Sequence, residues 1–279
     1  MQDLKTSADV QTGSAVVELR PPRVEQRPGP ARYGIFSRLR SYFILNPLIW
    51  AYTVVLGLIS LLVSLLGNTQ RILHKLARLW SQLIMKTILS PVTVTGLEKI
   101  DTSKPHVYAV NHASALDIPV LYVNLPFQFR ILFKSELLSY PIIGWHLTRS
   151  GQVCINQQEP TRSVGQIRSA LKSLKRGMPL VIFPEGGRTP DGNIKPFMAG
   201  AFFLAIKAQV DIVPVALVGT YELLPMNTYH IKCRPLEMRV GKPISTAGLH
   251  GHDMSALAAK VQKAMEELYY TGRDSAPTP

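Results

Sequence analysis

The longest apolar stretch of the chain lies near its N-terminus. No charged residue occurs from Ser41 to Gln70, and the run from Pro47 to Leu66 is almost wholly apolar. Asn46-Pro47 is typical of a helix start and Gly67-Asn68 of a helix end, so the pattern predicts a helix over about 47–66. A helix of about 20 residues is about 30 Å long, close to the hydrocarbon thickness of a bilayer. We expect a membrane-embedded helix. Basic residues flank it on both sides, so the pattern leaves open whether it crosses the bilayer or dips into it.

The next segment, about 70–88, alternates with helical period. Its apolar positions are Ile72, Leu73, Leu76, Leu79, Trp80, Leu83 and Ile84, and its polar positions are Arg71, Lys75, Arg78, Gln82 and Lys86. This pattern predicts a basic amphipathic helix. Its apolar face either lies in a membrane interface or packs on the following domain. We therefore treat 36–89 as a membrane-associated helical pair.

From Pro91 onward, short β-rich runs alternate with helical patterns. Predicted strands occupy 92–95, 107–110, 129–133, 152–155, 180–183, 212–217 and 236–240, and predicted helices about 115–124, 161–176, 199–209 and 254–270. Such alternation is typical of an α/β fold with a mainly parallel central sheet flanked by helices. We place this domain at 90–272. The tails at 1–35, which is basic, and 273–279 have no such period and are predicted to be disordered.

Composition limits the classes of binding partner that we expect for this chain. The net charge is +13 and the hydrophobic content 46%. Beside an apolar segment, this charge favours an anionic lipid surface, and no nucleic-acid-binding signature is present. The two cysteines, Cys154 and Cys233, indicate neither a disulfide framework nor a metal site. We expect an inner or cytoplasmic membrane location, with the α/β domain facing the cytoplasm.

One candidate for chemistry follows the predicted strand 107–110. His112 and Asp117 are five positions apart, which in a regular helix separates them by about 140° around the axis. They meet only if the chain turns between them, so we expect strand, turn and helix start. A carboxylate there would orient the imidazole and raise its basicity, as a general base requires. The alternative is structural, because Ser114 and Asp117 also fit a helix capping box.

A second charged segment follows the predicted strand 180–183. It reads Pro184-Glu185-Gly186-Gly187-Arg188. Glycines let the backbone approach a ligand, and a guanidinium suits a phosphate. The alternative is an ordinary polar loop, since Thr189 to Gly192 has turn chemistry. Ligands of open α/β sheets lie beyond the carboxyl ends of the strands, so we expect both segments at one edge.

Three segments in order carry a resemblance. Asn111-His112-x4-Asp117, Phe183 to Arg188 and Ile212 to Leu217 resemble the glycerophospholipid acyltransferase family typified by 1-acyl-glycerol-3-phosphate acyltransferase, which includes bacterial lysophospholipid acyltransferases. The resemblance covers roughly 90–245. It implies transfer of a fatty acyl group from acyl-CoA or acyl-carrier protein to the free hydroxyl of a lysophospholipid, foremost 1-acyl-glycerol-3-phosphate, which gives phosphatidic acid in phospholipid biosynthesis.

The resemblance also implies roles for residues. His112 would be the general base and Asp117 would orient it. Lys134 would stabilise a developing oxyanion, although a solvated lysine fits that position too. The expected substrate-binding residues are Asn111, Lys134, Glu185, Gly186 and Arg188. A thioester is activated enough for direct attack, so no metal, cofactor or nucleophilic serine is expected. The expected partners are membrane phospholipid, lysophospholipid and the thioester donor, and not nucleic acid.

Two positions depart from the family pattern. Gln157 stands where relatives usually have an arginine assigned to the acceptor phosphate, and Met198 and Ala199 stand where lysines are common. Either Arg162 takes over from the next turn, or the acceptor is a lysolipid without a phosphomonoester. A non-catalytic, membrane-anchored lipid-binding module is the alternative of a different class.

Overall fold

The computed structural model describes residues 34–67, 69–156 and 164–271. The tails predicted at 1–35 and 273–279 lie outside these ranges, except for Gly34 and Ile35. Ile35 already begins the first helix, so the N-terminal boundary expected after residue 35 falls inside that helix.

Seven strands form one sheet in the described part of the chain. They are β1 (Val92–Thr95), β2 (Val107–Val110), β3 (Arg130–Lys134), β4 (Val153–Ile155), β5 (Leu180–Ile182), β6 (Ile212–Val218) and β7 (Leu236–Val240). Their order across the sheet is β1-β7-β6-β2-β5-β3-β4, and only the β6 and β7 pairing is antiparallel. The predicted mainly parallel sheet is confirmed, and each predicted strand is found within one residue of its expected ends.

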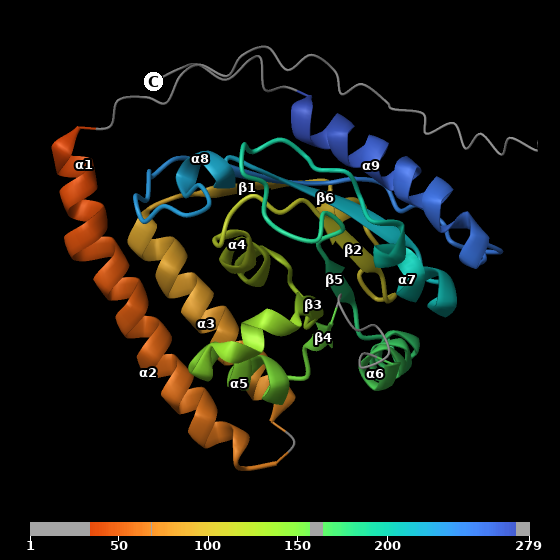
Figure 1. Ribbon diagram of the computed structural model, residues 1–279, viewed down its shortest axis with the longest axis horizontal. Coiled ribbons are helices and arrows are strands. Elements are labelled where there is room, and N and C mark those ends of the chain that lie inside the picture. The colour runs from red at the N-terminus through yellow and green to blue at the C-terminus, as the bar shows by residue number, and fades with distance from the viewer. Residues whose placement is uncertain (1–33, 68, 157–163, 272–279) are drawn as a thin grey trace, which may run out of the picture. The chain divides into compact units, whose positions relative to one another are not determined.

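Helices cover both faces of the sheet (Figure 1). On one face lie α3 (Gln70–Ile88) and α4 (Asp117–Asn124), and on the other α6 (Val164–Lys175), α7 (Phe203–Ala208) and α9 (Met254–Tyr270). Strand β2 shows why both faces of the sheet need to be covered. Tyr108 and Val110 join the apolar core under α3 and α4, whereas Val107 and Ala109 join the core under the other three helices. Buried on both faces, the central strand has an uninterrupted apolar sequence, as parallel strands do.

Short elements occupy the connections. The helices α5 (Pro141–Arg149) and α8 (Thr220–Leu223) have no counterpart among the predicted elements. Single turns of 3₁₀ helix occur at Leu97–Lys99, Ser135–Ser139, Ala199–Phe202 and Gly251–Asp253. Helix α5 is too short to show a clear period in the sequence, and it takes its structure from packing against the N-terminal helix.

The N-terminal helix begins earlier than predicted. It runs through α1 (Ile35–Arg40), a π-helical turn (Ser41–Leu45) and α2 (Asn46–Ser64) without a break. The predicted start at Asn46-Pro47 was therefore wrong. Proline lacks the N–H that would bond four residues back, and the π turn accommodates it by bonding the Asn46 N–H to the Ser41 carbonyl five residues back. The Asn46 side chain is not an N-cap, because its amide donates to the carbonyls of Ser41 and Tyr229, each at 2.7 Å.

Helix α2 packs on α3 and α5 through small and polar residues. Thr53 accepts a hydrogen bond from the indole N–H of Trp80 at 3.0 Å, and the Ser60 hydroxyl lies 2.6 Å from Nδ1 of His146. A Cβ at Gly57 would lie 2.2 Å from a side-chain carbon of α5. These contacts bring the helix close to the domain with its polar side inward.

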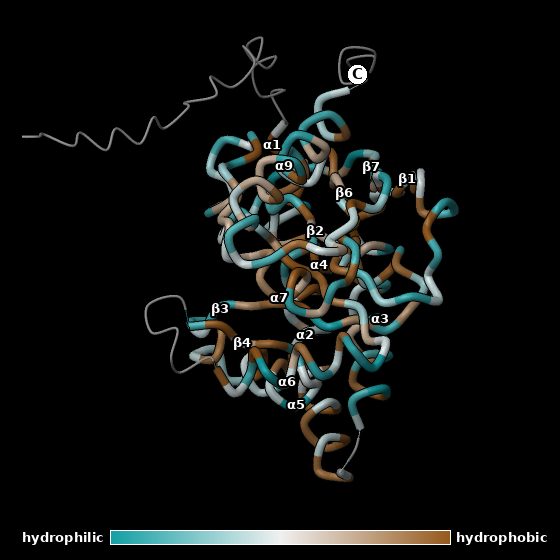
Figure 2. Tube along the Cα trace, turned by 90° about the vertical axis from the view of Figure 1, so that its right-hand side faces the viewer, coloured by the Kyte–Doolittle hydropathy of each residue, from teal (hydrophilic) through white to brown (hydrophobic). Residues whose placement is uncertain are grey.

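The opposite side of α2 is apolar and exposed. Its outward side chains are Trp50, Val54, Val55, Leu58, Ile59 and Leu62. Among the described residues, Ile35–Ser64 is the one helix long and apolar enough to cross a membrane, judged by length and composition. Helix α3 has the reverse arrangement: Leu73, Ile84 and Ile88 are buried while Arg71 and Lys75 are exposed. In Figure 2, hydrophilic and hydrophobic residues alternate along α3, whereas the visible lower end of the N-terminal helix is brown.

The apolar face of α3 therefore packs on the sheet domain, which is one of the two alternatives that its sequence left open. Ile72 and Leu79, at the margin of that face, are 48% and 43% exposed.

Candidate active site

The chain turns between His112 and Asp117, as their spacing requires. Strand β2 ends at Val110 and α4 begins at Asp117. One carboxylate oxygen of Asp117, Oδ2, lies 2.8 Å from Nδ1 of His112 and accepts backbone hydrogen bonds from Ala113 at 2.8 Å and Ser114 at 2.9 Å. Asp117 has no exposed surface. The turn therefore folds around this carboxylate.

Only one of the two hydrogen bonds of the predicted capping box is present. The Asp117 carboxylate does reach the Ser114 N–H, but α4 has Leu116 at its N-cap and no side-chain cap. The Ser114 hydroxyl instead donates to the carbonyl of Leu224 at 2.9 Å and accepts from the Leu116 N–H at 3.2 Å. The Ser114 hydroxyl therefore does not cap α4 as the capping-box alternative requires, because it joins the turn to a distant loop. Asp117 both closes the turn and orients the imidazole.

The His112 ring is held on two sides. Its face stacks on Phe183, with ring centroids 4.2 Å apart and planes 26° from parallel. An ionised carboxylate only accepts hydrogen bonds, so the Asp117 contact places the proton on Nδ1. Nε2 then carries a lone pair, and no side chain or backbone group of the described residues bonds to it. The side chain is 19% exposed, so the ring lies at the surface of this edge.

Glu185 joins the two motifs. β5 lies next to β2 and parallel to it, so the loops after both strands meet at one sheet edge. Glu185 Oε1 accepts the His112 N–H at 2.8 Å, and Oε2 accepts the Lys195 N–H at 3.0 Å. Thr189 donates its N–H to the His112 carbonyl at 2.8 Å. Both backbone polar groups of His112 are thus fixed by the loop after β5, and Glu185 is 5% exposed.

Burial controls the ionisation of Glu185. It raises the pKa of the carboxyl to about 7, while the hydrogen bonds from His112 and Lys195 and the Lys195 charge act in the opposite direction. Burial therefore favours the neutral form of this carboxyl. Glu185 connects two loops, because each of its carboxyl oxygens accepts a hydrogen bond from a backbone N–H.

The side chain of Asn111 is also hydrogen-bonded to the backbone. Its amide accepts the Leu217 N–H at 2.7 Å and donates to the Leu217 carbonyl at 3.1 Å, and the residue is 2% exposed. The structure does not bring this side chain to the surface of the site. Asn111 extends the β2 and β6 pairing by one step and so fixes the point from which His112 projects.

Positive charge gathers around Gly187. Lys134 ends β3 and Lys195 lies in the loop after β5. A Cβ built on Gly187 would lie 3.8 Å from Lys134 Nζ and 3.9 Å from Lys195 Nζ. Gly186 has a φ of +69°, which favours glycine. Arg188 is half-buried and makes no hydrogen bond or ion pair with any other described residue.

The sequence reading missed three residues of this edge. Phe183 was taken as the end of a strand, Thr189 as turn chemistry, and Lys195 was not singled out. Only Phe183 carried a signal, as the residue directly before the Pro184-Glu185 motif. Gln157 and Arg162, on which the question of the acceptor depends, lie outside the described residues.

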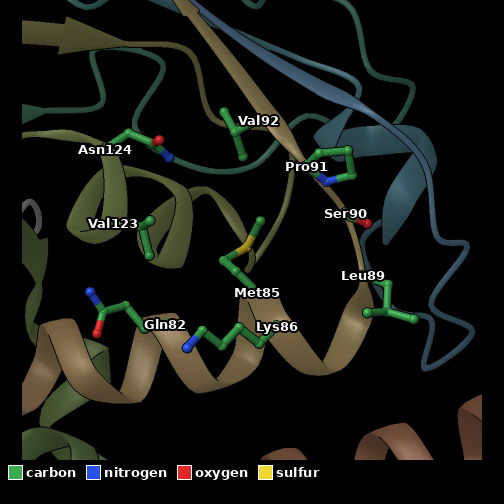
Figure 3. A pocket seen from close by; sticks show the side chains of 9 residues that line it. All are labelled: Gln82, Met85, Lys86, Leu89, Ser90, Pro91, Val92, Val123 and Asn124. Atoms are coloured by element: carbon green, nitrogen blue, oxygen red, sulfur yellow. The ribbon is translucent and has the colours of Figure 1, made fainter.

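A separate surface groove lies between α3, the start of β1 and the end of α4 (Figure 3). It is lined by Gln82, Met85, Lys86, Leu89, Ser90, Pro91, Val92, Val123 and Asn124. None of the predicted site residues lines this groove. This groove is thus separate from the candidate site at His112.

Known proteins share this chain's sequence and fold. The acyltransferase family model matches residues 91–218. The 1-acyl-sn-glycerol-3-phosphate acyltransferase of Saccharomyces cerevisiae is 30% identical over 210 residues, which cover 74% of this chain and 69% of that protein. The chain belongs to the acyltransferase family. The residues matched by the acyltransferase model include His112, Asp117, Lys134 and the loop from Glu185 to Lys195.

Other members of the acyltransferase family extend the comparison. Chloroplastic 1-acyl-sn-glycerol-3-phosphate acyltransferase LPAT1 of Arabidopsis thaliana is 32% identical over 197 residues, 69% of this chain and 55% of that protein. This chain spans about half the length of the plant and algal relatives. The crystal structure of the 1-acyl-sn-glycerophosphate acyltransferase PlsC of Thermotoga maritima has a TM-score of 0.66 at 23% identity, over 88% of this chain and 97% of that one. At that identity the likeness shows a shared fold.

Proposed function

We propose that this protein transfers a fatty acyl group from a thioester donor, acyl-CoA or acyl-carrier protein, to the free hydroxyl of 1-acyl-glycerol-3-phosphate and so forms phosphatidic acid. The observation that carries the proposal is the 2.8 Å contact between His112 Nδ1 and Asp117 Oδ2. It orients Nε2 as a base at a partly exposed edge. Membership of the acyltransferase family and the names of the relatives support the choice of reaction.

The chemistry needs one base and a positioned acceptor. Nε2 of His112 takes the hydroxyl proton while the hydroxyl oxygen attacks the thioester carbonyl carbon. The imidazolium that forms is stabilised by Asp117. The tetrahedral intermediate collapses by breaking the carbon–sulfur bond, and the proton passes from the imidazolium to the departing thiolate. The products are the ester and the free thiol, so the step balances without a covalent enzyme intermediate. Ser114 is fully buried, which argues against it as a nucleophile.

The acceptor is proposed to carry a phosphomonoester. Lys134 Nζ lies near Gly187, and Arg188 follows that glycine directly in the chain. Neither cation has a carboxylate partner among the residues described. Basic groups around exposed backbone suit a phosphate. This supports 1-acyl-glycerol-3-phosphate over the lysolipid without a phosphomonoester that Gln157 suggests.

The N-terminal helix is proposed to attach the enzyme to a membrane. A helix that turns small polar residues inward and Trp50, Leu58 and Leu62 outward is arranged for an apolar solvent. Because α2 packs along α3, a full crossing would carry exposed Arg71 and Lys75 into the hydrocarbon. We therefore propose that α2 dips into one leaflet, with the sheet domain on the cytoplasmic side of an inner or cytoplasmic membrane.

An activity matrix on the full chain in detergent tests the function. Acyl-CoA and acyl-carrier protein are each paired with 1-acyl-glycerol-3-phosphate, other lysophospholipids and monoacylglycerol, and products are identified by mass spectrometry. We expect phosphatidic acid as the main product. Preferred use of another lysophospholipid would overturn the acceptor assignment. Lipid binding without ester formation from any donor would instead support a non-catalytic module.

A further inference from the structure

We propose that Lys195 is a specificity-determining residue that binds the phosphate of the acceptor, together with Lys134. The inference rests on the proposed function and deepens it. Lys195 is the only lysine between Lys175 and Lys207, and the positions that follow it, Met198 and Ala199, are neutral. Lys195 is therefore the one lysine that the loop after β5 offers an anion, in addition to Arg188.

The backbone of Lys195 is fixed at the catalytic edge. Its N–H donates to Glu185, whose other oxygen accepts the His112 N–H. One carboxyl group thus ties the loop of Lys195 to the turn that carries the base. On either side of Lys195, the Ile194 N–H donates to the hydroxyl of Tyr270 at 3.2 Å and the Phe197 N–H to Gln262 at 3.0 Å. Helix α9 therefore holds the loop in place.

The side chain of Lys195 turns back over the glycines. Nζ donates to the Gly187 carbonyl at 3.1 Å. An ammonium has three donors, so two remain after this bond. Lys134 Nζ approaches the same glycine from the end of β3, a different element. Two ammonium groups thus converge where Gly187 has no side chain to separate them.

The charge of Lys195 acts on the buried carboxyl of Glu185, but the two groups form no ion pair in the described structure. No carboxylate forms an ion pair with Lys134 or Lys195 among the described residues, and the nearby Glu185 has both oxygens bonded to backbone N–H groups. Like charges held together are costly unless an anion binds between them. A phosphomonoester carries a charge of about −1.5 to −2 near pH 7, so it matches two cations better than a phosphodiester with one negative charge does.

Kinetics of Lys195→Met in detergent micelles test the inference. With 1-acyl-glycerol-3-phosphate varied at saturating donor, we expect KM to rise about tenfold or more while kcat changes less than about twofold, because a charge-assisted hydrogen bond to the ground state is lost. Lys195→Arg keeps the charge and should recover most of the affinity. Lys263→Met, at an exposed lysine of α9, is the matched control and should leave both constants unchanged. An unchanged KM in Lys195→Met, or a fall in kcat alone, would overturn the proposal.

A binding measurement keeps this test apart from that of the function. Glycerol 3-phosphate carries the phosphomonoester without an acyl chain, and we expect it to raise the melting temperature of the wild type and Lys263→Met but not of Lys195→Met. Equal shifts in all three proteins would refute the anion site. If the wild type forms no phosphatidic acid yet shows the Lys195-dependent shift, the proposed function fails and the phosphate site stands. Melting of the unliganded variants shows whether each is folded.

Discussion

The edge that carries His112 and the outer face of α2 place polar groups by opposite rules. At the edge, each backbone polar group of His112 and both oxygens of Glu185 are hydrogen-bonded inside the protein, under apolar strands. Helix α2 keeps its small polar residues, such as Thr53 and Ser60, inward and exposes its apolar side. The polar groups of the edge are satisfied inside the protein, as in a domain surrounded by water, whereas the exposed side of α2 suits the apolar environment that we propose for it. Under the proposed function, chemistry and membrane attachment belong to separate parts of one chain.

His112→Ala is expected to have the largest effect on turnover without an effect on membrane binding. Removal of the base should lower kcat by about 10³-fold, since general base catalysis contributes about 10² to 10⁴. Vesicle binding should stay as in the wild type, because the substitution does not touch α2. Turnover is measured with 1-acyl-glycerol-3-phosphate in detergent, and binding by co-sedimentation with anionic vesicles. Near wild-type turnover would remove His112 from the mechanism.

Glu185 should make stability depend on pH. Burial raises its pKa from 4.5 to about 7, so between these values the unfolded chain loses its proton first and the folded protein keeps it. The free energy of unfolding should then fall as pH rises from about 4.5 to about 7, by about 3 kcal/mol in total. Urea unfolding of the full chain in detergent at pH 5 and pH 8 measures the drop.

Glu185→Gln is the matched variant for that experiment, because it cannot ionise. Its stability should lack this part of the pH dependence, whatever its absolute value, since the amide loses one acceptor for the His112 or Lys195 N–H. An identical pH slope in both proteins would show that Glu185 is ionised at all these pH values.

Asp117→Asn should cost about 10²-fold in kcat. Asparagine keeps an oxygen to accept the Ala113 and Ser114 N–H groups, so the turn should still form. It removes the charge that stabilises the imidazolium. The melting temperature should fall by only a few degrees. If turnover is retained while stability drops, Asp117 serves the turn and not the base.

Much of the catalytic edge could be predicted from local sequence. The seven strands are short β-rich runs with polar boundaries, and all seven were placed within one residue. The contact between His112 and Asp117 followed from their spacing, and the proximity of Glu185 from the parallel sheet. These features depend on local pattern and on one topological rule.

The features that escaped prediction depend on partners far away in the sequence. The bonds of Asn111 go to Leu217, 106 residues later, and the contact of Lys195 with Gly187 depends on the path of a loop. The start of α1 was missed because Arg38 and Arg40 were taken as flanking charge. The inward face of α2 was hidden because a helix that is apolar nearly throughout has no visible stripe.

The smallest effect is expected from a substitution on the exposed apolar side of α2, which tests whether that side contacts lipid. Leu62 is 65% exposed, and if its exposed part lies in lipid, Leu62→Ser should weaken binding to anionic vesicles by about tenfold, since burial of a leucine contributes about 1.5–3 kcal/mol. Val164→Ser, at a valine of α6 that is 52% exposed on the other side of the sheet, is the control and should bind as the wild type does. Turnover in detergent should be unchanged in both. Equal vesicle binding by all three proteins would mean that the exposed apolar side of α2 faces something other than lipid, and the contrast between the two regions would then concern a protein partner.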